Sequence, residues 1–248
     1  TFVFDDLLSP WLTARRDARR VLGRYTMPLL RSSERLETRI HILIRNSTSG
    51  WYRDDEYYRL STLYVFAEYL GWVRNIEREF AFVRLESERR DREFNARFHG
   101  FFRAMSSFSY FRLYQDAAAV GACEVPRLMA SAIGEVMTPG ESTTSVLDFS
   151  EFVDAYGSGP RFTRWLTELD AVLRRADEGD HLCQDRLIAA AANLRALCAL
   201  LDPRGRCVRP RRLAHLERIH HEPVRRTLVK EFPDLVPAEH RSGERRVP

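Results

Sequence analysis

The sequence has almost no lysine and lacks the glycine-rich motifs that hold phosphate groups. Lys230 is the only lysine among the 39 basic residues, and it follows Val229. A Walker loop needs a lysine that follows glycine, so this class of nucleotide site is excluded. No Gly-x-Gly-x-x-Gly or Gly-x-Ser-x-Gly pattern occurs, which leaves no support for a dinucleotide-binding fold, a kinase loop or a hydrolase elbow. We attribute the arginine excess to a GC-rich genome, whose codons favour arginine over lysine.

The sequence also has few cysteines, and none of them forms a Cys-x-x-Cys pair. The four are Cys123, Cys183, Cys198 and Cys207. Cys183 and Cys198 fall on one predicted helix about 22 Å apart, at about 1.5 Å per residue, so they cannot bridge each other. Scattered cysteines among apolar neighbours are typical of small buried side chains in a reducing compartment, so we expect a cytoplasmic protein.

No apolar run reaches the roughly 20 residues that a membrane-spanning helix needs. The longest nearly apolar stretch, 63–73, is shorter and contains Glu68. No secretory signal is present. The chain begins at Thr1 rather than at methionine, which leaves open that a preceding segment with a membrane anchor has been removed.

Helical periodicity dominates, and no segment alternates apolar and polar residues between hairpin turns. Pro28 is expected to interrupt or kink the first helical stretch. Asp180 and Asp202 bracket a helix over 181–201. Short connections between long helices predict antiparallel neighbours. We therefore predict an all-α fold, an antiparallel bundle of about seven helices around a central long aromatic helix.

The central helix is predicted from the segment 51–82, which is rich in tyrosine, tryptophan and phenylalanine and reads as one helix over about 54–85. Between Leu63 and Val73 its only charged residue is Glu68. A helix that is apolar on nearly every side belongs at the centre of a fold, surrounded by other helices.

Glu68 is the candidate buried polar residue of this helix. It has no cation three or four residues away on its own helix. If buried, it must pair with another helix or keep its proton. We expect a structural pair with Arg39, Arg45 or a tyrosine hydroxyl rather than a catalytic acid.

A basic cluster lies near the start of the chain, on positions that spread over about half of the circumference of a helix. It comprises Arg15, Arg16, Arg19, Arg20 and Arg24. We interpret it as a candidate basic contact, a juxtamembrane stretch on the cytoplasmic side of a missing anchor. The alternative is a solvated helix end.

Positive charge is also concentrated at the other end of the chain. From Arg204 onward there are 12 basic and 6 acidic residues, whereas the preceding 203 residues hold 27 basic and 29 acidic ones. We divide the chain into a helical bundle domain, 1–203, and a basic, partly ordered C-terminal tail, 204–248. Such a tail is more often a solubilising extension than a nucleic-acid contact.

Two Glu-x-x-His motifs raise the question of a di-iron site: Glu178 with His181, and Glu217 with His220. About one acid-x-x-His match is expected by chance in a chain of this composition. The first motif straddles Gly179 and a helix cap, and the second lies in the basic tail. We expect no metal ion and no cofactor from these motifs.

Five spaced elements form a further pattern: Leu36–Ile40, Arg59–Val73, Ile133–Met137, Phe152 with Phe162–Trp165, and Leu200–Pro203. The pattern resembles a group of uncharacterised bacterial helical proteins in which a hydrophobic anchor often precedes an arginine-rich helix. The resemblance covers about residues 10–203, and the group has no assigned activity, so no functional residue is carried over. It implies a bacterial protein with a cytoplasmic domain and a lost N-terminal anchor.

The absence of catalytic motifs favours a non-enzymatic helical interaction or scaffold domain. We expect it to bind a second copy of itself or another protein, and to be tethered to the cytoplasmic face of the membrane. Two alternatives stay open. The aromatic helix could line a pocket for a small ligand or cofactor, and the basic tail could bind nucleic acid.

Overall fold

The structure of the chain is a computed structural model. It describes residues 2–80, 89–114, 116–140, 145–209 and 212–237, and it places only the backbone of residues 2–22, 80, 89–91 and 161. The described residues form eleven α-helices and one 3-10 turn and contain no strand. The predicted all-α class is confirmed. Within these ranges, no helix is apolar over a stretch long enough to cross a membrane.

The helices and the 3-10 turn follow one another along the chain. They are α1 (Phe2–Arg45), α2 (Trp51–Asp54), α3 (Glu56–Phe80), α4 (Arg89–Phe98), α5 (Gly100–Met105), α6 (Ala117–Ala122), α7 (Arg127–Val136), α8 (Phe149–Gly157), α9 (Pro160–Asp177), α10 (His181–Leu201), the 3-10 turn η1 (Leu216–Arg218) and α11 (Glu222–Glu231). The predicted helix over 181–201 is α10. Its start is fixed by Asp180, whose carboxylate accepts hydrogen bonds from the amides of Leu182 at 3.0 Å and Cys183 at 3.1 Å.

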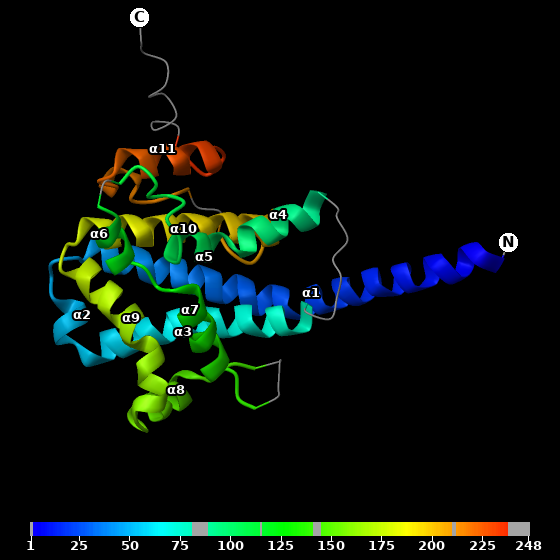
Figure 1. Cartoon of the computed structure of the whole chain (residues 1–248), viewed down its shortest axis with the longest axis horizontal. Coiled ribbons are helices and arrows are strands. Elements are labelled where there is room, and N and C mark those ends of the chain that lie inside the picture. Colours follow the sequence, from blue (N-terminus) through cyan, green and yellow to red (C-terminus); the bar gives the residue numbers. More distant parts are fainter. Residues whose placement is uncertain (1, 81–88, 115, 141–144, 210–211, 238–248) are drawn as a thin grey trace, which may run out of the picture.

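α1 is longer than the sequence predicted. It runs for 44 residues without interruption, so the expected interruption at Pro28 is wrong. Proline inside a helix removes one hydrogen bond and crowds the preceding turn, but Tyr25 and Leu29 are buried on either side of it, and this packing holds the helix together. From about Tyr25 onward, α1 packs within the bundle. The preceding part of α1 projects beyond the bundle as a single helix (Figure 1).

α1 lies between α3 and α10, and these three helices form the middle of the bundle (Figure 1). Side-chain contacts show that both neighbours run antiparallel to α1, because the partner numbers fall as the α1 numbers rise. The contacts, with the α1 residue first, are Tyr25–Trp72, Arg39–Thr62, Leu30–Cys198 and Glu37–Arg195. The other helices cover the outer faces, with α7 and α8 on α3 and with α4, α5, α9 and α11 on α10.

The helix buried on every side is α10, not the aromatic helix. Residues 182–198 of α10 are all buried, whereas α3 keeps Tyr64, Glu68 and Trp72 partly exposed along one side. The sequence pointed to α3 because it is rich in large apolar side chains. α10 reaches the centre through small ones, since four consecutive alanines, 189–192, let its neighbours approach closely.

The segment after residue 203, predicted as a basic, partly ordered tail, packs into the bundle as far as the structure describes it. α11 lies against α10, and the amide of Leu213 donates to the carbonyl oxygen of Leu235 at 2.8 Å. Seven apolar side chains of the segment belong to the main core: Leu213, Leu216, Ile219, Val224, Leu228, Phe232 and Val236. The packed domain therefore extends past the predicted boundary to about residue 237, and residues 238–248 lie outside the described part of the chain.

α7 crosses α3 at a glycine that brings the two backbones close together. A Cβ atom on Gly134 of α7 would lie 2.6 Å from the carbonyl oxygen of Leu70 and 2.9 Å from Cβ of Arg74. Packed carbon atoms separate to about 3.5–4.0 Å, so no side chain fits there. The close crossing also brings Glu135 to Arg74, whose Nε donates to Oε2 at 2.7 Å.

Replacing Gly134 with alanine should therefore lower the free energy of unfolding by about 1–3 kcal/mol, as overpacking does. Gly121→Ala is the matched control, because a Cβ atom there has nothing within 4 Å. The control should keep or slightly raise stability, since alanine is the better helix former. Urea unfolding followed by circular dichroism measures both variants, and equal stabilities would contradict the close crossing.

Candidate functional site

Three helix ends meet in the structure: the C-terminal ends of α6 and α9 and the N-terminal first turn of α10. The three ends gather Cys123, Asp180 and Cys183, whose sulfur and carboxylate oxygen atoms lie within 4.8 Å of one another. Among the described residues, this is the one group of histidine, cysteine and acidic side chains close enough to hold a metal ion. We call it the thiol–carboxylate cluster.

Local backbone geometry places each member of the cluster. Gly179, with a left-handed φ of +94°, turns the chain from α9 into α10. Asp180 follows as the N-cap of α10, and Cys183 lies in the turn that it caps. Cys123 directly follows α6, and its Sγ lies 3.8 Å from Oδ1 of Asp180. The cluster therefore rests on capped helix ends rather than on a free loop.

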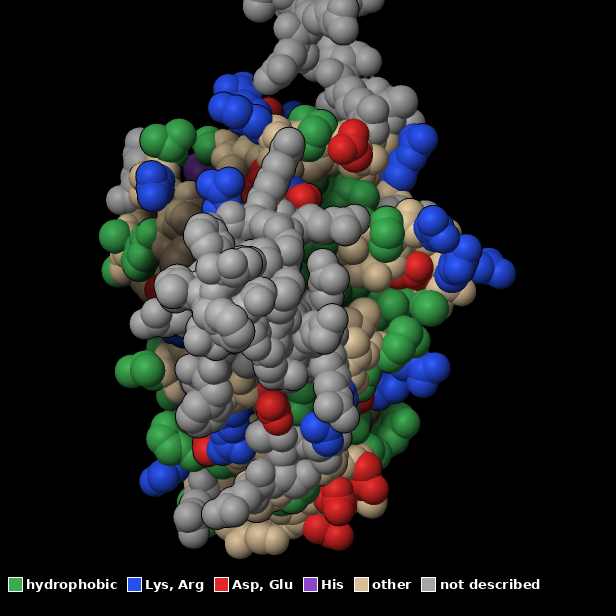
Figure 2. Space-filling view, turned by 90° about the vertical axis from the view of Figure 1, so that its right-hand side faces the viewer, with side chains coloured by type: hydrophobic (Ala, Val, Ile, Leu, Met, Phe, Trp, Pro, Cys, Tyr) green, Lys and Arg blue, Asp and Glu red, His purple; other side chains and the backbone are tan. Residues whose placement is uncertain are grey.

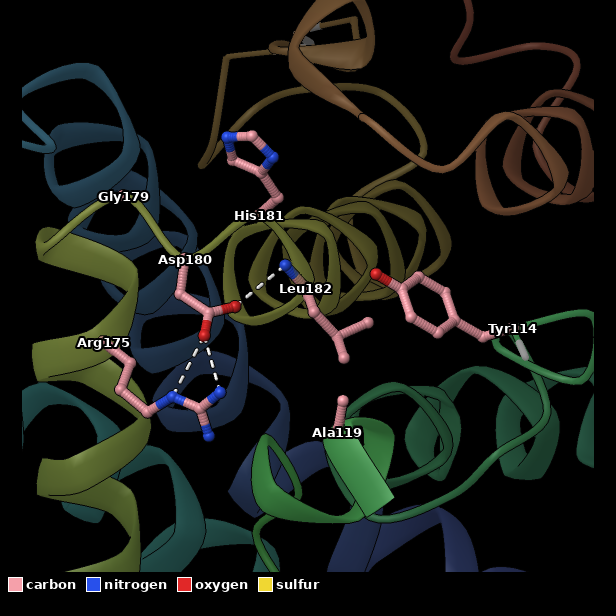
Figure 3. Close-up of a pocket in the computed structure, with 7 residues that line it drawn as sticks. All are labelled: Tyr114, Ala119, Arg175, Gly179, Asp180, His181 and Leu182. Atoms are coloured by element: carbon pink, nitrogen blue, oxygen red, sulfur yellow. Dashed lines mark hydrogen bonds and ion pairs between the residues drawn. The ribbon is translucent and has the colours of Figure 1, made fainter. Parts of the chain in front are cut away.

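Arg175 of α9 ties the three helix ends together. Its Nε and Nη2 donate to Oδ2 of Asp180 at 3.0 and 2.6 Å (Figure 3). Its Nη1 donates to the carbonyl oxygen of Ala122, the last residue of α6, at 2.8 Å. One guanidinium group thus links α9, α6 and the cap of α10.

A second arginine near the cluster, Arg186, lies in α10 one turn after Cys183. Arg186 is fully buried, and it donates to the carbonyl oxygens of Ala104 at 2.7 Å and of Ser107 and Val120 at 3.2 Å. These carbonyls lie at or just after the ends of α5 and α6, where helices lack internal partners. The guanidinium also lies 4.6 Å from the ring centroid of Phe111. Burial lowers the pKa of Arg186 from its ordinary value.

The two thiols of the cluster differ in acidity. The hydrogen bond from Cys183 is the main reason that the pKa of the Cys123 thiol is lowered, and the nearby Arg175 and Arg186 act in the same direction. The pKa of Cys183 is raised by the same hydrogen bond and by burial. Burial acts to raise the pKa of Asp180, but the amides of α10 and Arg175 outweigh it and lower the pKa. Cys123 is thus the thiol that loses its proton first.

A pocket of about 320 Å³ lies next to the cluster and is open to solvent (Figure 3). The residues that line it are Tyr114, Ala119, Arg175, Gly179, Asp180, His181 and Leu182. Figure 3 shows the Asp180 carboxylate facing the Arg175 guanidinium, with the His181 ring pointing away from both. Asp180 belongs to both the pocket and the cluster, so the pocket adjoins the cluster at this carboxylate.

Backbone contacts hold the segment before α11 against the same end of α10. The carboxylate of Asp185, whose pKa is raised by burial, accepts hydrogen bonds from the amides of His220 at 2.9 Å and His221 at 2.8 Å. The ring of His220 stacks on that of His181 with centroids 3.6 Å apart. The ring of His221 meets Tyr114, which lines the pocket, edge to face at 4.8 Å.

Glu68 forms an interhelical ion pair, with a partner that the sequence analysis did not name. Nη1 of Arg35 donates to its two carboxylate oxygens at 2.8 and 2.7 Å. Arg39, one of the expected partners, instead bonds Thr62, because the antiparallel register places the preceding turn of α1 beside Glu68. The side chain of Glu68 is 13% exposed and that of Arg35 is 52% exposed, so the pair lies at the rim of the α1–α3 interface.

The basic cluster lies on α1, where the structure gives the backbone alone for Arg15, Arg16, Arg19 and Arg20. Arg24 is exposed, and its guanidinium carbon lies 5.9 Å from the ring centroid of Tyr25. Its role as a basic contact stays a prediction.

The two Glu-x-x-His motifs are not brought together as ligand sets in the described residues. The structure instead brings together three potential metal ligands that no single sequence motif predicts. Asp180 and Cys183 belong to the N-terminal cap and first turn of α10, and Cys123 lies 57 positions from Asp180 in the sequence. Of the four cysteines, Cys207 is exposed and the other three are buried as expected.

The pH dependence of stability should differ between Glu68 and Glu135. Burial raises the pKa of Glu68 above its ordinary value of 4.5, and Arg35 offsets this only in part. The folded chain holds that proton more tightly, so the stability that Glu68 contributes is lost as the pH rises through its raised pKa. Hydrogen bonds from Arg74, together with Arg78, lower the pKa of Glu135, so its contribution is lost as the pH falls.

Urea unfolding at several pH values from about 4 to 7 tests these signs with two matched variants. Relative to the parent chain, Glu68→Gln should gain stability as the pH rises, whereas Glu135→Gln should lose it. Both effects should stay within about 1 kcal/mol, because the partner arginine of Glu68 and the carboxylate of Glu135 are partly exposed. Profiles with the same slope would contradict the two opposite environments.

Comparisons with known proteins assign this chain to no family. No protein-family model matches it, and neither a curated protein nor a solved structure does.

Proposed function

We propose that this chain is a non-enzymatic helical interaction domain, and that the part of α1 before Tyr25 binds an anionic membrane surface. We call residues 2–24 the α1 arm. One observation carries the proposal: the arm is helical and projects beyond the bundle (Figure 1). A helix that continues past its packing partners within the fold leaves its surface available to a binding partner outside the fold.

The arm is too long to be explained as a frayed helix end. A helix of its length extends for about 35 Å at about 1.5 Å per residue. In proteins, most of the stability of a helix comes from packing of an amphipathic face rather than from intrinsic helix propensity. Among the α1 residues whose side chains are described, Tyr25 is the first that is buried, and it meets Trp72 with ring centroids 6.4 Å apart. A stable arm therefore calls for a partner surface.

The sequence of the arm fits a membrane interface. Apolar residues recur three or four positions apart, at Phe4, Leu7, Leu8, Trp11, Ala14, Ala18, Val21 and Leu22. The basic cluster contributes five arginines against the three aspartates Asp5, Asp6 and Asp17. A helix with aromatic and aliphatic residues at this spacing, and arginines between them, is typical of one that lies in the headgroup region.

The described surface around the arm does not share this bias. Figure 2 looks onto the side of the bundle from which the arm emerges, and basic and acidic side chains are interspersed on its described part. Positive charge suited to an anionic surface is thus a property of the arm rather than of this face of the bundle. Anionic lipid headgroups attract basic residues by about 1 kcal/mol each.

Small-ligand binding is the second candidate, and the pocket beside α10 favours it. Nucleic-acid binding through the C-terminal segment has less support. Arg225 and Arg226 pair with Glu222, and Arg218 donates to the carbonyl oxygen of Ile44 at 2.8 Å. Part of the charge of that segment is therefore used within the fold.

Vesicle co-sedimentation tests the membrane proposal. The parent chain should bind vesicles that contain about 30% phosphatidylglycerol more strongly than phosphatidylcholine vesicles, because attraction to anionic headgroups adds to burial of the apolar side. A variant that replaces the five arginines of the basic cluster with glutamine should bind the anionic vesicles more weakly by on the order of 1,000-fold or more, at about 1 kcal/mol for each arginine.

The matched control removes the same charge elsewhere, from five exposed arginines: Arg204, Arg206, Arg209, Arg212 and Arg226. It should bind like the parent chain, apart from a small long-range electrostatic loss. Equal losses in the two variants, or equal binding of the parent chain to both kinds of vesicle, would contradict the proposal.

A further inference from the structure

We propose that Cys123, Asp180 and Cys183 bind one thiophilic divalent cation, best matched by Zn²⁺, and that its fourth coordination position faces the adjoining pocket. The proposal rests on the thiol–carboxylate cluster and is independent of the α1 arm.

The spacing of the cluster suits a tetrahedral ion. Zinc binds sulfur at about 2.3 Å and carboxylate oxygen at about 2.0–2.2 Å, so tetrahedral ligand atoms lie about 3.5–3.8 Å apart. The three ligand atoms here already lie within 4.8 Å of one another, and Cys123 Sγ lies 3.8 Å from Asp180 Oδ1. Small side-chain shifts bring them to bonding geometry.

The types of ligand select the metal. Two thiolates favour zinc and other thiophilic ions over magnesium and calcium, which prefer all-oxygen sites. Both Cys123 and Cys183 are fully buried, and this protects a thiolate pair from competing reactions. Their backbones are fixed by the end of α6 and the capped start of α10, so the site is largely formed before an ion binds.

Arg175 serves as the outer partner of the carboxylate. It donates two hydrogen bonds to Oδ2 of Asp180. Oδ1 points toward Cys123 and accepts hydrogen bonds from the amides of Leu182 and Cys183. Ligating carboxylates commonly keep such hydrogen bonds, which orient them. The ion takes the place that the Cys123 thiol proton has at Oδ1, so Asp180 needs no new rotamer.

Charge in the surroundings supports two thiolates. Binding releases one proton from each thiol, and the ligand set then carries three negative charges against two on the ion. Arg175 balances the remaining charge, and Arg186 lies one turn beyond Cys183. The cationic surroundings of Cys123 and Cys183 are thus matched to the loaded site.

Three protein ligands leave one position of the tetrahedron for water or a ligand group. Structural zinc sites close with four protein ligands, whereas sites with three keep an open position. Asp180 lines the pocket of about 320 Å³, and His181 points away from its carboxylate (Figure 3). The pocket therefore supplies the fourth ligand from solution, which makes this an open site.

Metal titration of the whole chain tests the proposal. The chain is purified with reductant, stripped of metal with a chelator, and titrated with Zn²⁺ under native mass spectrometry. One ion per chain should add about 63 Da, the zinc mass less two thiol protons. Co²⁺ should give near-ultraviolet thiolate absorption and the visible bands of a tetrahedral site.

The two other cysteines supply matched controls. Cys123→Ser and Cys183→Ser should each weaken Zn²⁺ binding about 100-fold or more, whereas the buried Cys198→Ser and the exposed Cys207→Ser should bind as the parent chain does. Asp180→Asn keeps an N-cap, so it should stay folded and bind at least about 10-fold more weakly. Circular dichroism of each variant confirms that weak binding does not reflect unfolding.

Three results would overturn the proposal. One is the absence of stoichiometric Zn²⁺ binding by the reduced, folded chain. Another is an equal loss of affinity in all four cysteine variants, which would indicate adventitious binding. The third is a chain that stays about 2 Da lighter in the presence of reductant and whose peptide map links Cys123 to Cys183, which would identify these two residues as a disulfide pair instead.

Discussion

The arrangement of this fold depends on one constraint: a helix that is covered on all sides carries charged and polar side chains that must find partners. Arg195 of α10 meets Glu37 of α1, with Nε and Oε1 2.8 Å apart, and their side chains are 3% and 1% exposed. His41 lies 3.2 Å from the same carboxylate. A buried charge without a partner costs several kcal/mol, so α1 and α10 pack in the register that joins Arg195 to Glu37.

The same constraint builds the candidate site. Nη1 and Nη2 of Arg186 find acceptors only where α5 and α6 present their terminal carbonyls, and Cys123 directly follows α6. Because Cys183 lies one turn before Arg186, the packing that gives Arg186 these acceptors also carries Cys123 to Cys183. Asp185 acts in the same way on the other side of α10, where it holds the amides of His220 and His221. The site is thus a consequence of how α10 is buried.

Local signals were enough to predict the elements with clear ends. Asp180 and Asp202 gave the bounds of α10, because capping and helix termination are decided within a few residues. Pro28 misled, because the packing of Tyr25 and Leu29 overrides a local penalty. An interhelical partner for Glu68 was predictable from its apolar surroundings. Its identity was not, because Arg35 and Arg39 differ only by the register of α1 against α3.

Long-range features had no local signal. The sequence placed the aromatic helix at the centre, because large apolar side chains are conspicuous, whereas α10 is central through its alanines and its paired charges. Cys123 and Cys183 are 60 positions apart in the sequence, and only the packing of α6 on α10 unites them. The positive charge of the C-terminal segment concealed the apolar residues, such as Leu228 and Val236, that anchor it in the core.

A double-mutant cycle on Glu37 and Arg195 tests most directly whether paired charges on α10 set the packing. Glu37→Gln and Arg195→Met should each lower the free energy of unfolding by about 3–5 kcal/mol, since each leaves a buried group without its partner. The double variant should lose at least about 2 kcal/mol less than the sum of the two single losses. Single losses below about 1 kcal/mol that simply add would contradict the account.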